Sequence, residues 1–118
     1  MEFSTEFKQA LSADQEATNL WAKYKKTGEA FYIEQTMLAM NRARGKYEES
    51  GHLASAGDCG RAIVKYLLAK EAVTGADCTP EILLALQQAK RHYIAAGFPG
   101  DTQKTQEILD EIEARHKP

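Results

Sequence analysis

Apolar residues recur at intervals of three and four along most of the chain, which is the spacing of one helix face. The clearest run is Ile82, Leu86, Ala89, Tyr93 and Ala96. Similar stripes cross residues 7–24, 33–47, 63–73 and 105–112. Alternation of β-branched and polar residues between turn residues, the mark of a strand, is nearly absent. The pattern therefore predicts an all-α protein.

Four glycines mark the ends of these stripes. Gly28, Gly51, Gly75 and Gly97 each follow the last apolar position of a run. Glycine adopts the left-handed conformation that ends a helix, so we expect C-terminal caps or turns there. The resulting prediction is a single domain, 1–118, of about five antiparallel helices in a helical-hairpin array or a bundle. Their expected ranges are 4–26, 29–49, 55–74, 80–96 and 102–116.

Two helix starts have a chemical signature. Thr79-Pro80-Glu81 combines a hydroxyl cap, a proline at the first helical position and an acid near the positive end of the helix dipole. Asp101 is the expected N-cap of the last helix.

Residues 38–51 match residues 84–97 at an offset of 46, with Leu, Ala, Ala, Tyr and Gly recurring in place. Each copy is followed by a Gly-Asp pair and another predicted helix. The chain then consists of a leading helix, 4–26, and two hairpins, 29–74 and 80–116, that would stack as an array. The alternative is that two amphipathic helices ending in glycine simply look alike.

These elements resemble the tetratricopeptide class of helical-hairpin repeats. The resemblance covers about residues 30–116, and Tyr-x-x-x-Gly closes predicted helices at Tyr24/Gly28, Tyr47/Gly51 and Tyr93/Gly97. The small residues Ala43 and Ala89 lie where two helices of such a hairpin approach closely. The period of 46 departs from the 34 of that family, and no proline closes each hairpin. The resemblance implies a scaffold that binds a peptide or protein segment without catalysis.

Composition and charge narrow the function. The chain has 118 residues, 43% of them apolar and 27% charged, and a net charge of −2. That charge removes the bulk electrostatic argument for nucleic-acid binding, and no apolar run is long enough to span a membrane. Because the first residues lack a signal-peptide pattern, we expect a cytoplasmic protein. Cys59 and Cys78 are expected to be free thiols, with a disulfide as the alternative.

Candidate chemistry is sparse. Glu49–His52 and Glu113–His116 have the Glu-x-x-His spacing of carboxylate-bridged metal sites, but the further glutamates of such a site are not evident. Cys59 is expected to be buried or half-buried, and Cys78 partly exposed. Gly57–Gly60 lacks the lysine and spacing of a phosphate loop. We therefore expect no enzyme, no cofactor and no metal.

Two predicted helices carry apolar residues around more than one face, so these residues are either central in the core or exposed at an interface. The candidate anchors for a partner are Phe31, Leu38, Leu83 and Leu84. The candidate basic rim is Arg42, Arg44, Lys46, Lys90 and Arg91. These sets predict an adaptor, chaperone-like binder or inhibitor that holds a protein or peptide segment in an apolar groove, or a homodimer face. The alternative is a small helical regulator that uses the basic residues on nucleic acid.

Overall fold

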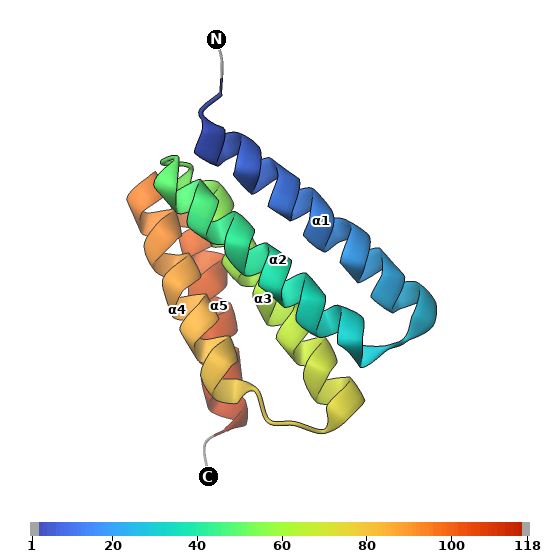
Figure 1. Cartoon of the computed structure of the whole chain (residues 1–118). Helices are drawn as coiled ribbons and strands as arrows, with labels where there is room; N and C mark the ends of the chain where they lie inside the picture. Colours follow the sequence, from blue (N-terminus) through green and yellow to red (C-terminus); the bar gives the residue numbers. More distant parts are fainter. Residues whose placement is uncertain (1–2, 117–118) are drawn as a thin grey trace.

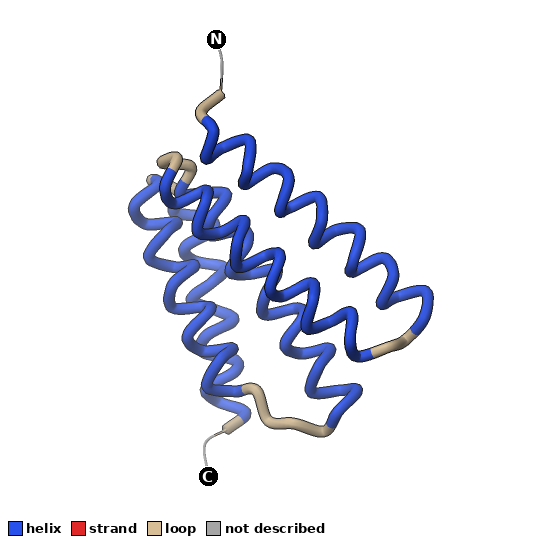
Figure 2. Tube along the Cα trace, in the orientation of Figure 1, coloured by secondary structure: helices blue, strands red, loops and turns tan. Residues whose placement is uncertain are grey.

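A computed structural model describes residues 3–116, and it confirms an all-α protein (Figure 1). Within these residues there are five helices: α1 (Thr5–Thr27), α2 (Ala30–Glu49), α3 (Leu53–Thr74), α4 (Thr79–Ala96) and α5 (Pro99–Arg115). Short loops connect them, and consecutive helices run in opposite directions (Figure 2).

Glycine ends the helices as predicted. Gly28, Gly75 and Gly97 are the C-caps of α1, α3 and α4, and Gly51 lies in the turn after α2. All four have a positive φ, between 72° and 79°. Residues with a Cβ rarely adopt this conformation, so these positions stop each helix at its glycine.

Three helix starts differ from the prediction. α4 begins at Thr79 with Cys78 as its N-cap and no side-chain cap hydrogen bond, so Thr79 is not the cap, and its hydroxyl donates to the Asp77 carboxylate over 2.6 Å. α5 begins at Pro99, so Asp101 lies in its first turn and is not its N-cap. The fixed φ of proline suits the first helical position, and this explains the earlier start. α3 begins at Leu53, which places Gly57 and Gly60 inside the helix.

The two glycines inside α3 allow α4 to approach closely. A Cβ added at Gly57 would lie 2.9 Å from the Tyr93 ring, and one at Gly60 would lie 3.1 Å from the Ala89 Cβ. Glycine weakens a helix, so its presence here reflects the packing of α3 against α4.

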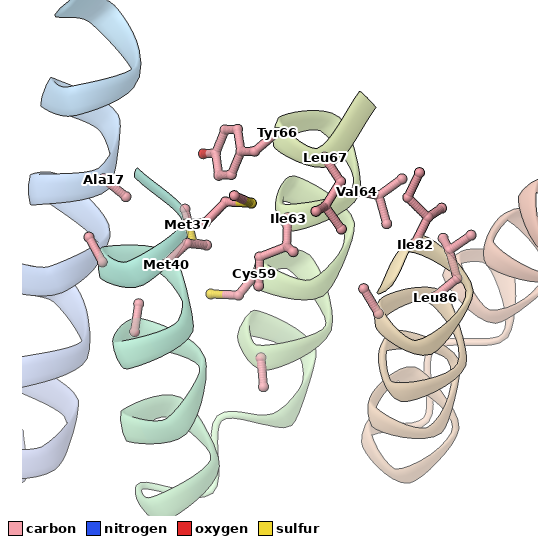
Figure 3. Close-up of a cluster of buried hydrophobic side chains, with 14 of the residues drawn as sticks. Ala17, Met37, Met40, Cys59, Ile63, Val64, Tyr66, Leu67, Ile82 and Leu86 are labelled. Atoms are coloured by element: carbon pink, nitrogen blue, oxygen red, sulfur yellow. The ribbon is translucent and has the colours of Figure 1, made fainter. Parts of the chain in front are cut away.

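The helices form a thin layered array with Cα extents of 51 × 35 × 17 Å. Each helix packs mainly against its neighbours in sequence, most extensively α1 against α2 and α3 against α4. The core lies between the packed helices (Figure 3). Its largest fully buried side chains include Tyr93, Ile33, Ile82 and Leu86.

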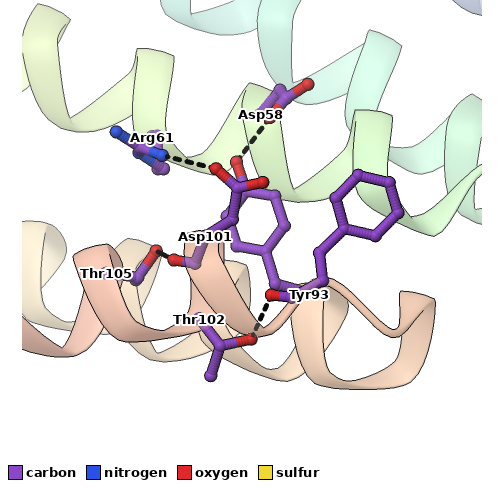
Figure 4. Close-up of polar contacts among 7 residues, drawn as sticks. Asp58, Arg61, Tyr93, Asp101, Thr102 and Thr105 are labelled. Carbon is purple, nitrogen blue, oxygen red and sulfur yellow. Dashed lines mark hydrogen bonds and ion pairs between the residues drawn. The ribbon is translucent and has the colours of Figure 1, made fainter.

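The same tyrosine–aspartate hydrogen bond joins two pairs of neighbouring helices. The Tyr47 hydroxyl in α2 donates to the Asp14 carboxylate in α1 over 2.8 Å. The Tyr93 hydroxyl in α4 donates to the Asp58 carboxylate in α3 over 2.5 Å (Figure 4). These hydrogen bonds and the packing pair α1 with α2 and α3 with α4. The predicted scheme instead set the first helix apart and paired the second with the third and the fourth with the fifth.

Both cysteines are free and buried. Burial, with the nearby Asp14 and Asp58 carboxylates, raises the pKa of the Cys59 thiol to about 12. Cys78 is only 4% exposed, so the expectation of partial exposure is wrong. Its loop folds inward because the Cys78 backbone N–H donates to the Glu71 carboxylate over 2.8 Å.

Candidate functional site: a groove between α2 and α4

A groove of about 370 Å³ opens between α2 and α4, with α3 as its floor. Ile63 and Leu67 of α3 line the floor, and both belong to the buried core. Leu38 of α2 and Leu84 of α4 line the walls, and they are 55% and 53% exposed. The middle of the groove is therefore apolar and open to solvent.

The two walls carry the same order of side chains. From the N-terminal end, α2 contributes Glu34, Leu38, Asn41 and Arg44, and α4 contributes Glu81, Leu84, Gln88 and Arg91. In each helix ten positions separate the glutamate from the arginine, which corresponds to about 15 Å of helix. Since α2 and α4 run in the same direction (Figure 1), both glutamates lie at one end and both arginines at the other.

The basic end continues into a polar cavity of about 190 Å³. Arg44 and Gln88 line both cavities, and the Arg44 guanidinium donates to the Gln88 side-chain oxygen over 2.8 Å. Glu48 lies 3.4 Å from His92 Nε2 and 3.9 Å from Arg44 Nε. His92 Nδ1 is buried and has no hydrogen-bond partner among residues 3–116.

The acidic end is only partly neutralised. The Lys70 ammonium of α3 lies 2.9 Å from the Glu34 carboxylate, and this hydrogen bond raises the pKa of Lys70. Glu81 at this end and Arg91 at the other end make no ion pair within the described part of the chain. The groove thus keeps one unpaired charge of each sign.

The structure separates the four predicted anchors. Leu38 and Leu84 lie in the groove, and Phe31, at 62% exposure, is seven residues before Leu38 on the same side of α2. Leu83 is partly buried and packs against the core. It is two positions from Ala85, which lines the groove, so Leu83 projects from another side of α4.

The predicted basic residues do not form one patch. Only Arg44 and Arg91 line the groove and its polar end. The other three are engaged elsewhere: Arg42 lies 2.8 Å from Glu16 of α1, Lys46 lies 3.2 Å from Glu49, and Lys90 donates to Gln106 of α5 over 2.6 Å.

Sequence reasoning did not select the polar residues of the walls, Glu34, Glu81, Asn41 and Gln88. The signal for them is an offset of 47, one more than the 46 of the apolar repeat, at which the pairs Glu34/Glu81, Asn41/Gln88 and Arg44/Arg91 recur. A search of the exposed positions at this offset would have identified the polar residues of both walls.

In both Glu-x-x-His pairs the histidine ring contacts residues other than the glutamate of the pair. The His52 ring stacks on Phe7, with centroids 3.9 Å apart, and its Nδ1 lies 2.9 Å from Ser50 Oγ. His116 lies 2.7 Å from Thr79 Oγ1 and donates from Nδ1 to the Ile112 carbonyl. Nowhere within residues 3–116 do three or more metal-ligating side chains lie close together. In the same range, none of the helices combines the length and apolarity that a membrane crossing requires.

Comparison with known proteins gives no relative: the chain matches no family profile, no curated protein and no solved structure.

Proposed function

We propose that this protein is a protein-interaction module that binds a partner polypeptide segment in the groove between α2 and α4. The observation that carries the proposal is the exposure of Leu38 and Leu84 on opposite walls of a solvent-open groove. An apolar groove between helices is a recurring way of binding the apolar side chains of a partner segment. Such a module acts as an adaptor, chaperone-like binder or inhibitor.

The groove favours a short segment that carries opposite charges at its two ends. Its volume of about 370 Å³ accommodates a few apolar side chains. Arg44 and Arg91 favour an acidic group at one end, and Glu81 favours a basic group at the other. The segment therefore binds in one direction, since the reverse direction places like charges together. We also place the protein in the cytoplasm, where its two free thiols stay reduced.

Capture from a native lysate tests this function with matched variants. Leu38→Asp and Leu84→Asp put a charge into the groove. Ile94→Asp is the control, because Ile94 is equally exposed, at 58%, but lies outside the groove on α4. We expect folded Leu38→Asp and Leu84→Asp proteins to lose at least nine-tenths of a captured polypeptide that the wild type and Ile94→Asp retain.

Salt distinguishes the nucleic-acid alternative. A segment held by apolar anchors stays bound in 0.5 M NaCl, whereas binding through phosphate contacts weakens steeply with salt. Capture that survives both groove variants, or that is lost after nuclease treatment, contradicts the proposal.

A further inference from the structure

We propose that the α2–α4 face also binds a second copy of this chain, to form a two-fold symmetric dimer. The proposal does not depend on the existence of a partner segment. It rests on the order of charges along the groove, which makes this face complementary to itself.

The symmetry argument starts from the two parallel walls. Each wall runs from glutamate through leucine to arginine over ten residues, and α2 and α4 point the same way. Consider a second copy turned by a two-fold axis that lies in the face and perpendicular to both helices. Each helix then meets its own counterpart in the reverse direction, and the interface is isologous because both copies use the same face.

This arrangement places opposite charges together. Glu81 of one copy faces Arg91 of the other, and the same pair forms a second time across the axis. Glu34 and Arg44 are related in the same way. Leu38 and Leu84 lie near the middle of their walls, so they meet their counterparts close to the axis. A two-fold axis parallel to the helices would instead set glutamates against glutamates, so the charges select the antiparallel arrangement.

Glu81 and Arg91 are the best-placed charges for this interface. Both are exposed, and neither has an ion-pair partner within residues 3–116. Glu34 and Arg44, by contrast, already contact Lys70 and Gln88 in the single chain. Exposed ion pairs contribute little affinity, so Leu38 and Leu84 hold the dimer together and the charges set its direction.

Sedimentation equilibrium of the purified chain between 1 and 200 µM tests the dimer without any partner. We expect the wild type to dimerise within this range. Leu38→Asp and Leu84→Asp should weaken the dimer at least a hundredfold, whereas Ile94→Asp should leave it within threefold of the wild type. A wild type that is monomeric throughout, or a dimer insensitive to both groove variants, overturns the proposal.

A charge exchange tests the antiparallel arrangement. Glu81→Arg alone and Arg91→Glu alone each create two like-charge contacts, and each should weaken the dimer about tenfold or more. The double variant, Glu81→Arg with Arg91→Glu, restores opposite charges and should return the dissociation constant to within threefold of the wild type. Single variants that strengthen the dimer, or a double variant that does not recover, overturn the proposal.

The outcome is separable from that of the proposed function. A dimer in the pure protein with no captured partner supports this inference alone, and capture by a strictly monomeric protein supports only the proposed function. Where both hold, the same face serves both, so excess protein should compete with the captured segment.

Discussion

Two grooves of nearly equal volume lie on different sides of α3, and they differ in how their polar groups are satisfied. The α2–α4 groove has about 370 Å³, and the groove beside α4 and α5 has about 360 Å³. In the second groove Asp58 accepts from Tyr93 and Arg61 lies 3.3 Å from Asp101 (Figure 4). Lys65 lies 5.4 Å from the centroids of the Trp21 and Tyr66 rings. The charged groups of this groove therefore already have partners within the chain.

The comparison shows that volume alone does not identify a binding face. The α2–α4 groove exposes two leucines and leaves Glu81 and Arg91 unpaired within residues 3–116. The groove beside α5 uses its polar groups to join α3 to α4 and α5. We therefore propose the first groove for recognition and the second for structural support.

The largest expected effect on stability comes from a substitution in the groove beside α5. Tyr93 is fully buried and joins α4 to α3 through its ring and its hydroxyl. Tyr93→Ala should reduce the free energy of unfolding by about 4 kcal/mol, because it leaves a cavity and removes the donor to Asp58. Leu84→Ala, at an exposed position, should change it by less than about 0.5 kcal/mol. Urea denaturation measures both values, and equal losses would contradict the division between the grooves.

Alkaline pH should weaken the packing that joins the helix pairs. Burial and the hydrogen bonds to Asp14 and Asp58 raise the pKa of Tyr47 and of Tyr93 above the ordinary 10.0, and the pKa of Cys59 is about 12 against an ordinary 9.0. Below about pH 8 all three groups are protonated in both states, and their stabilisation is complete.

As pH rises from 9 to 12, the unfolded chain releases these protons first, so the free energy of unfolding falls. Tyr47→Phe has one proton fewer to release, and its stability should fall less steeply over this range. Urea titrations at pH 8, 10 and 11 test the slope, and parallel curves for the two proteins would refute the explanation.

A pair of glycine substitutions sharpens the packing argument. Gly57→Ala should lose about 1–2 kcal/mol, because its Cβ would lie 2.9 Å from the fully buried Tyr93 ring and the gain in helix propensity is smaller than the clash. Gly45→Ala in α2 meets no atom within 4 Å, so it should gain up to about 1 kcal/mol. Thermal unfolding gives both shifts, and a stabilised Gly57→Ala protein would show that α3 and α4 can separate easily.

The smallest effect distinguishes the arginines of the two grooves. Arg61→Ala removes a partly exposed ion pair with Asp101 and should cost about 0.5 kcal/mol without affecting binding. Arg91→Ala should leave stability unchanged within about 0.3 kcal/mol, but it should weaken both segment capture and dimerisation. The opposite pattern would assign recognition to the groove beside α5.

The helices were predictable because apolar spacing and terminal glycines are local signals. The pairing of the helices was not, because it depends on Tyr47–Asp14 and Tyr93–Asp58, which bridge 33 and 35 positions. Leu83 was chosen with Leu84 because the α4 sequence is apolar on several sides. Only the packing of α4 in the folded chain shows which side is covered.

The buried position of Cys78 depends on a contact that the apolar pattern does not signal, its backbone bond to the Glu71 side chain seven positions earlier, across the loop between α3 and α4. The exposure of Leu38 and Leu84 follows from the array itself, since α2 and α4 pack on α3 and leave the groove between them open.

Site-specific photocrosslinking in intact cells tests the central claim most directly. A photoreactive residue replaces Leu84 in the α2–α4 groove or, in a second protein, Lys65 in the groove beside α5. Our account predicts polypeptide adducts, with a second copy or a partner, from position 84 and at most a tenth as many from position 65. Equal yields, or adducts from position 65 alone, would contradict it.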